Sequence, residues 1–231
     1  MHGPEGWAST AAALPTDARR ARETPFWRAL VERFSWRRVA DAGCGSGFHV
    51  ALLREIGVEV FGFDRALAPL VEAARGHLLV GDLLAPPLRA HTFDAVLCLG
   101  NTVSLLGSRW AQRTAIAALA RVLHPGGALL LQGEDVGALV ASGPVVRTRS
   151  LSDGRVHLRV FERRGRRVEM RAGVVAPGAE ARLEGAWLLP TSAASLAEVG
   201  AAVRLKPIPL PVDPPGGGAT WWLLLAGPAN P

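Results

Sequence analysis

Several residue types are scarce or absent in this chain of 231 residues. Tyrosine does not occur, and the two cysteines, Cys44 and Cys98, lie far apart in the sequence. Two distant cysteines do not indicate the disulfide framework of a small secreted protein, so a reducing cytoplasm is the expected location. No apolar run approaches the ~18 residues of a membrane-spanning helix. The opening segment, MHGPEGWAST, lacks the basic start and hydrophobic stretch of a secretion signal.

Lysine is also scarce, since Lys206 is the only lysine among the 26 residues that are lysine or arginine. The formal net charge is +6, and its distribution is uneven. Between positions 145 and 171, nine arginines oppose three acids, so this segment carries +6 (9 − 3) and the rest of the chain is neutral overall. A basic segment of this kind fits a solvated surface, an anionic small molecule or RNA. With 49% hydrophobic residues, the chain is expected to form a globular protein.

The middle of the chain alternates between apolar strands and helices. Between positions 37 and 135, strands are expected at RRVADAG, VEVFGFD, HLLVGD, FDAVLCLGN and GGALLLQGED. Helices are expected at HVALLREIG, ALAPLVEAARG and WAQRTAIAALARVL, and one at 16–34 precedes the first strand. Several strands are apolar almost throughout, which indicates a parallel sheet covered by helices on both faces.

Beyond position 135 the pattern changes to strict alternation. The segment RVHLRVFERRGRRVEMRAGVV turns at Gly165 and predicts an antiparallel hairpin. Arg155, His157 and Arg159 fall on one side of its first strand, and such a basic face is expected mainly to contact solvent. The hairpin is followed by TSAASLAEVG, a helix expected to end at Gly200, and by the late strands AVRLKPIPL and TWWLLLAG.

The segment DAGCGSG, from Asp41 to Gly47, follows an expected strand and opens a helix. A glycine loop at this place lets a ligand approach backbone N–H groups. The chain lacks the Gly-Lys-Ser/Thr of a P-loop, and Phe48 occupies the third small position of the dinucleotide fingerprint. Asp41 would also repel a pyrophosphate. S-adenosylmethionine has no phosphate and carries a sulfonium and an ammonium, so a neighbouring acid favours it.

DAGCGSG resembles the first motif of the class I S-adenosylmethionine-dependent methyltransferases, acid-x-G-x-G-x-G. The resemblance implies an α/β fold with a Rossmann-like seven-stranded mixed sheet, an antiparallel last strand, helices on both faces and an inserted antiparallel hairpin. It implies S-adenosylmethionine as cofactor and no metal. Asp64 would accept the ribose hydroxyls, Asp82 the adenine amino hydrogens, and Leu83 would donate its backbone N–H to the ring. The cofactor-binding residues implied are Arg22, Asp41, Gly43, Cys44, Gly45, Gly47, Asp64, Arg65, Asp82, Leu83, Leu99, Gly100 and Asn101.

The acceptor is less well defined. GNTVSLL after the fourth strand resembles the branch of glycine and sarcosine N-methyltransferases, and it differs from the Asn-Pro-Pro-Tyr-type motif that acts on nucleic-acid bases. This likeness implies that Leu99 and Asn101 lie nearest the methionine part of the cofactor. It also implies that Arg22 binds the cofactor carboxylate, although a solvated helix arginine is the competing interpretation. The absence of tyrosine argues against tyrosine-dependent amine recognition.

The expected function is therefore methyl transfer to a nitrogen or oxygen of a small molecule by in-line displacement. Two alternatives stay open: an RNA methyltransferase that uses the arginine-rich hairpin, and a non-catalytic cofactor-binding module. No catalytic base is identified, and Glu134, Asp135 and His157 are candidates. One domain is expected over 1–231. Its parts are a helical cap (1–35), a cofactor-binding core (36–135), a basic hairpin covering the substrate (145–190), and a final helix with a strand pair (191–231).

Overall fold

The computed structural model describes residues 17–66, 76–215 and 220–227. A seven-stranded sheet forms its centre, in the order β10-β11-β5-β4-β1-β2-β3. β1 pairs in parallel with β2 and β4, and β5 pairs in parallel with β4. β11 runs antiparallel to both of its neighbours, β5 and β10. This arrangement confirms the predicted mixed sheet with an antiparallel last strand. The strands span Arg38–Ala42 (β1), Glu59–Asp64 (β2), Leu78–Val80 (β3), Phe93–Cys98 (β4), Leu123–Glu134 (β5), Lys206–Ile208 (β10) and Thr220–Ala226 (β11).

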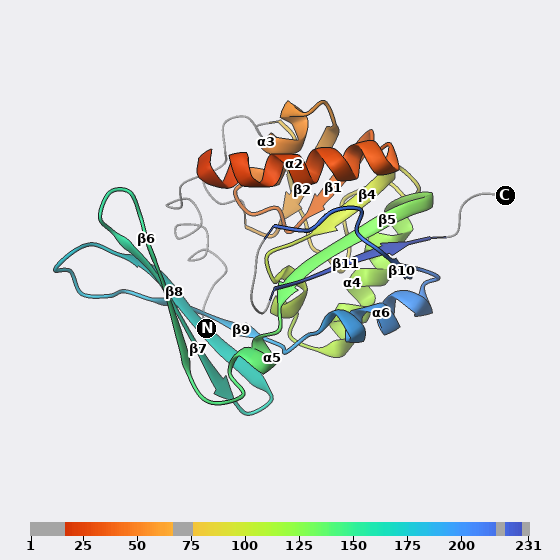
Figure 1. Cartoon of the computed structure of the whole chain (residues 1–231). Helices are drawn as coiled ribbons and strands as arrows, with labels where there is room; N and C mark the ends of the chain where they lie inside the picture. Colours follow the sequence, from red (N-terminus) through yellow and green to blue (C-terminus); the bar gives the residue numbers. More distant parts are fainter. Residues whose placement is uncertain (1–16, 67–75, 216–219, 228–231) are drawn as a thin grey trace.

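Helices cover both faces of this sheet (Figure 1). α2 and α3 pack on one face, and α4 and α6 pack on the other. Ser108 caps α4, because its side chain accepts a hydrogen bond from the Ala111 N–H at 3.1 Å. Ser192 caps α6 in the same manner, and this helix continues two residues beyond Gly200, where the sequence predicted its end. The helices span Asp17–Phe34 (α2), Phe48–Glu55 (α3), Arg109–Val122 (α4), Val136–Leu139 (α5) and Ala193–Ala202 (α6), with a 3-10 turn at Thr102–Leu105 (η2).

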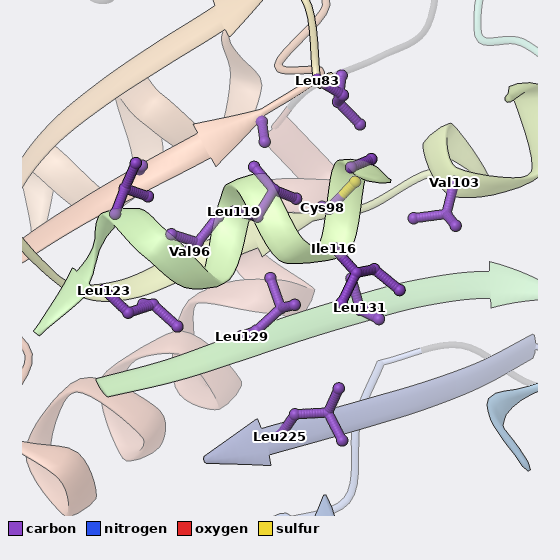
Figure 2. Packing of buried hydrophobic residues seen from close by; sticks show 14 of the residues in the cluster. Leu83, Val96, Cys98, Val103, Ile116, Leu119, Leu123, Leu129, Leu131 and Leu225 are labelled. Carbon is purple, nitrogen blue, oxygen red and sulfur yellow. The ribbon is translucent and has the colours of Figure 1, made fainter. Parts of the chain in front are cut away.

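Two apolar clusters hold the layers together. On one face, the Trp222 ring of β11 lies 5.1 Å from the Phe26 ring of α2, and Trp27 beside it is fully buried. On the other face, Ile116 and Leu119 of α4 point toward the buried side chains of β4 and β5 (Figure 2). Each fully buried side chain of this size contributes roughly 1.5–3 kcal/mol. The continuously apolar strands are therefore explained by burial on both sides. The helix expected at ALAPLVEAARG lies largely outside the described residues.

A second sheet is inserted between β5 and α6. It contains four antiparallel strands in the order β6-β7-β8-β9 and lies to one side of the main sheet (Figure 1). The predicted hairpin is its central pair, which turns at Gly165 as expected, but the insertion is larger than a hairpin because β6 and β9 extend it on both edges. The strands span Val145–Ser150 (β6), Val156–Arg164 (β7), Arg167–Val175 (β8) and Glu184–Leu188 (β9).

Backbone carbonyls of the core anchor the inserted sheet near the β7–β8 turn. Arg163 donates to the carbonyl oxygen of Gly137, and Arg167 donates to that of Gly107, both at 2.9 Å. The buried Phe161 and Met170 pack against Val136 of α5. Because β5 leads directly into α5 and this sheet, the insertion lies at the edge where the parallel strands end.

Candidate cofactor site

The glycine loop between β1 and α3 has three glycines in the left-handed region of the backbone. Gly43, Gly45 and Gly47 all adopt positive φ, at 77°, 53° and 81°, where residues with a Cβ are disfavoured. A Cβ at Gly43 would lie 2.4 Å from Cγ2 of Thr102, so a larger residue does not fit. Among the described residues, no atom lies within 4 Å of a Cβ built at Gly45. Gly45 therefore faces open space, as a cradle for a ligand requires.

Cys44 packs beneath this loop as a buried side chain and does not act as a reactive thiol. The side chain is buried in the apolar cluster below α2 and α3. Burial, with the negative charges of Asp41 and Asp64, raises the pKa of the thiol far above its usual range. Cys98 at the end of β4 is buried as well, and its pKa is raised for the same reasons. Both thiols are protonated at neutral pH and unreactive.

Asp41 at the end of β1 is the most unusual acid of the site. Its side chain is 2% exposed, and its buried Oδ2 has no hydrogen-bond partner in the part of the chain that the structure describes. Burial raises its pKa to about 6, the positive charges of His49 and Arg19 oppose the shift, and Asp64 adds to it. A buried carboxylate oxygen without a donor is costly, by roughly 1–3 kcal/mol. A cationic ligand at this strand end would compensate it, which fits the ammonium or sulfonium of S-adenosylmethionine.

Asp64 connects the end of β2 to the glycine loop. Its Oδ2 accepts the Gly45 N–H at 2.9 Å, and its Oδ1 accepts the Ala66 N–H at 3.1 Å. A carboxylate offers about four lone-pair positions, so two remain for further donors such as ribose hydroxyls. The loop amides thereby hold the acid in place.

Asp82 follows β3 and forms a local turn. Oδ1 accepts the Leu84 N–H at 2.9 Å, and Oδ2 lies 3.7 Å from Nε of Arg65. The Asp82 side chain is 41% exposed, whereas its neighbour Leu83 is buried. Arg65 is 71% exposed. The Asp82 carboxylate is thus partly exposed, with its Oδ2 near Arg65.

The end of β4 turns sharply into η2. Gly100 and Asn101 have φ of 69° and 68°, in the left-handed region that glycine and asparagine tolerate best. The Gly100 N–H donates to Oε1 of Gln132 at 2.7 Å. Oδ1 of Asn101 accepts the Glu134 N–H at 2.6 Å. Asn101 therefore joins the ends of β4 and β5, while the buried Leu99 precedes it.

α2 presents a different arginine to the loop from the one that the sequence favoured. Arg22 is 57% exposed, and its nearest recorded ion-pair contact is Glu23, at 3.8 Å. Arg19 lies with its guanidinium carbon 4.0 Å from the centre of the Phe48 ring and 3.2 Å from Nε2 of His49. Arg19 rather than Arg22 therefore contacts the first turn of α3, and Arg20 lies further from it, with its guanidinium carbon 5.9 Å from the centre of the Phe48 ring.

Glu23 is a buried acid that the sequence did not single out. Its Oε1 accepts from Nε of Arg19 at 2.7 Å, and its Oε2 lies 3.2 Å from Nε2 of His49. Burial opposes its ionisation, but the hydrogen bond and charge of His49 and the contacts of Arg19 prevail and lower its pKa to about 2. Glu23 is therefore ionised at neutral pH and holds the side chains of Arg19 and His49 beside Phe48. In the sequence, the spacing of four residues between Arg19 and Glu23 on the expected helix could have predicted this ion pair.

The three candidate bases have different surroundings. Asp135 caps α5 by accepting the Ala138 N–H at 3.0 Å. Glu134 is 7% exposed at the end of β5 and is contacted by Arg147 and Arg159. His157 is 9% exposed, and its Nε2 has no hydrogen-bond partner among the described residues. The expectation that the basic side of β7 mainly contacts solvent is wrong for His157 and Arg159, because Phe161 directs the same side of the strand toward α5.

Comparison with known proteins matches part of the chain to a family model and to curated relatives. Residues 40–131 match the family model of the methyltransferase domain. The glycine/sarcosine N-methyltransferase of Aphanothece halophytica is 30% identical over 135 residues, covering 54% of this chain and 51% of the relative. The probable tRNA methyltransferase 9B of Bos taurus is 36% identical over 105 residues, covering 44% and 22%. The chain thus spans about half or less of these relatives.

A solved structure resembles the chain over nearly its full length. S-adenosylmethionine-bound CalS10, an amino pentose methyltransferase from Micromonospora echinaspora, has a TM-score of 0.69, 25% identity, and coverage of 95% of this chain and 94% of its own. The strand order and the glycine loop define a Rossmann-like methyltransferase fold. The matched domain, the relatives and the solved structure together support a class I S-adenosylmethionine-dependent methyltransferase. No helix in the described part is long and apolar enough to cross a membrane.

Proposed function

We propose that this protein transfers the methyl group of S-adenosylmethionine to a nitrogen or oxygen of a small molecule. The observation that carries the proposal is the buried Oδ2 of Asp41, which has no hydrogen-bond partner among the described residues and lies beside the glycine loop. An anionic cofactor would add to the negative charge of Asp41 and Asp64, whereas a cationic one offsets it. The amino pentose and glycine/sarcosine specificities of the proteins compared above support a small acceptor.

Different residues would bind different parts of the cofactor. Asp41, Gly43 and Gly45 would hold the amino acid part of the cofactor, Asp64 the ribose, and Asp82 with Leu83 the adenine. Arg65, Gly47 and Cys44 would complete the walls, and Leu99, Gly100 and Asn101 would border the methyl group. Arg19 is the better-placed arginine for the cofactor carboxylate, although Arg22 remains a candidate. When bound, the cofactor supplies an electrophilic methyl group, so the protein mainly orients the acceptor and excludes water.

The finer nature of the acceptor and the location belong to the same proposal. An anionic small molecule is favoured over RNA, because base stacking calls for aromatic side chains among the arginines. Phe161, the aromatic residue in the middle of the basic strands, is fully buried. A cytoplasmic location is supported by the two buried free thiols.

Calorimetry and product analysis test this function. We expect S-adenosylmethionine to bind the full chain more tightly than NADH or ATP. Labelled S-adenosylmethionine, incubated with panels of amines, amino sugars and hydroxy acids, should transfer its label to one class of compound. Tight binding of NADH or ATP in preference to S-adenosylmethionine would overturn the proposal. If the cofactor binds and its label passes to RNA but to no small molecule, then RNA is the methyl acceptor and the small-molecule part of the proposal is wrong.

A further inference from the structure

Four cationic or potentially cationic side chains share the core-facing side of the inserted sheet. In the register of β6 and β7, Arg147 lies opposite Arg159, and Arg149 lies opposite His157. Residues two apart on a strand point to the same face, and cross-strand neighbours lie about 4.5–5.5 Å apart at Cβ. We call these four residues, Arg147, Arg149, His157 and Arg159, the inner basic face.

The inner basic face is not neutralised within the described structure. Glu134 is the acid that contacts it, through an ion pair of Oε1 with Arg147 and a longer approach of Oε2 to Nη1 of Arg159 at 3.6 Å. No ion pair is recorded for Arg149 among the described residues. Three guanidinium groups against one carboxylate leave two uncompensated positive charges. Like charges directly opposite each other on a sheet are destabilising, so this arrangement calls for a further anion.

Two buried polar atoms, one on the inner basic face and one on the acid that contacts it, lack hydrogen-bond partners among the described residues. Oε2 of Glu134 and Nε2 of His157 are both buried without a hydrogen bond in the described structure. Burial, and then the charges of Arg159 and Arg149, lower the pKa of His157, so its imidazole is neutral at pH 7 and keeps one N–H to donate. Buried polar atoms are normally satisfied, and an unsatisfied one indicates a missing ligand or water.

The other arginines of the insertion serve different ends. Arg155 pairs with Asp153, and Arg163 and Arg167 bind core carbonyls. On the opposite face of the sheet, Arg164 pairs with Glu162 and approaches Glu169, and Arg171 also approaches Glu162. The inner basic face is therefore distinct within the basic segment. It also lies beside the proposed transfer site, because the backbone of Glu134 is bonded to Asn101 at the end of β4.

We propose that the inner basic face binds a carboxylate or phosphate group of the methyl acceptor. In this arrangement Arg149, Arg159 and His157 donate to the anion. Glu134 occupies Arg147 and competes for Arg159 until the acceptor arrives. The acceptor thus carries its anionic group on the side away from the atom that is methylated. This inference rests on the proposed function for its acceptor, but the anion site itself can be tested without methyl transfer.

The test measures binding of sodium phosphate and sodium acetate to the full chain by calorimetry at constant ionic strength, with chloride as the reference anion. We expect saturable binding of one or both, and their relative affinities assign phosphate or carboxylate. Arg149→Gln and Arg159→Gln should each weaken that binding about tenfold or more, as the loss of a charge-assisted hydrogen bond predicts. Arg166→Gln removes the same charge at the exposed β7–β8 turn and should have no effect.

The Glu134→Gln variant distinguishes loss of the anion site from general loss of structure. Because it removes the internal competitor, it should tighten phosphate or acetate binding severalfold, which a misfolded variant would not do. Weaker binding in Glu134→Gln, or equal losses in Arg149→Gln and Arg166→Gln, would overturn the inference. So would absence of small-anion binding combined with binding of a single-stranded RNA oligonucleotide that Arg149→Gln abolishes.

S-adenosylmethionine binding, measured on the same samples, distinguishes the two proposals. If the cofactor binds and the anions do not, the anion site fails while the proposed function stands. If the anions bind and the cofactor does not, the proposed function fails.

Discussion

Replacement of Asp64 tests the cofactor site most directly, because this carboxylate joins β2 to the glycine loop. It accepts the N–H groups of Gly45 and Ala66 at 2.9 and 3.1 Å, and it retains lone pairs for the ribose hydroxyls. Asp64→Ala removes charge-assisted hydrogen bonds that together contribute about 1.5–3 kcal/mol to cofactor binding. We therefore expect S-adenosylmethionine to bind about 10- to 150-fold more weakly. Asp64→Asn keeps the size and one acceptor oxygen, so its loss should be smaller.

The assay is isothermal titration calorimetry of the folded variants, with a melting curve for each. Asp94 provides a matched control near the start of β4, at the opposite end of the parallel strands from Asp64. Its Oδ2 accepts the backbone N–H groups of Arg37 and Arg38, both at 2.8 Å. Asp94→Asn should lower the melting temperature and leave the cofactor Kd unchanged. An unchanged Kd in folded Asp64→Ala would refute the assignment of this strand end. Equal weakening in both variants would show that affinity merely follows stability.

Three further predictions concern the loop and its charge. Gly45→Val should abolish S-adenosylmethionine binding in calorimetry while circular dichroism shows a folded chain, because the new side chain fills the open space that now lies beside Gly45. Gly43→Ala should lower the free energy of unfolding by roughly 1–3 kcal/mol in a denaturant titration, since its φ is 77° and its Cβ would overlap Thr102. Cofactor affinity should fall as pH decreases from 7 to 5, by at most about tenfold per unit, because Asp41, with its pKa raised to about 6, becomes protonated and loses its attraction for a cation. A cationic ligand lowers that pKa in the complex, so binding releases a proton, and a titration of Asp41→Asn should give a flatter profile.

The main sheet could be predicted from the sequence because its signals are local. β4 and β5 are apolar over most of their length, and the glycine loop stands at the single place where β1 must turn into α3. The edges of the inserted sheet lack such signals. β6 reads VVRTRS and exposes most of its side chains, and β9 has five residues. Both strands exist because they pair with the central hairpin, and such pairing depends on contacts distant in sequence.

The orientation of side chains was harder to predict than the elements that carry them. Arg19 lies near the centre of the buried stripe of α2 that contains Glu23 and Trp27, whereas Arg22 lies at its margin. The sequence identified the helix, but choosing between two arginines three residues apart required its rotation. On β7, the alternation placed Arg155, His157 and Arg159 on one side correctly, but that side was expected mainly to contact solvent, whereas His157 is buried. Phe161 shares the side of His157 and fixes which face meets the core.

The distribution of charge provides a reason for the position of the insertion. The ends of β1 and β2 collect Asp41 and Asp64 where a cationic cofactor is proposed, and the inner basic face collects guanidinium groups beyond the end of β5. A single pocket with both sets would pair the acids with the arginines and leave neither free for a ligand. Asn101, bonded across to the backbone of Glu134, lies at the boundary between the two regions. Glu134 joins the two regions, because its backbone bonds to Asn101 and its carboxylate pairs with Arg147, so its replacement should alter anion binding more than cofactor binding.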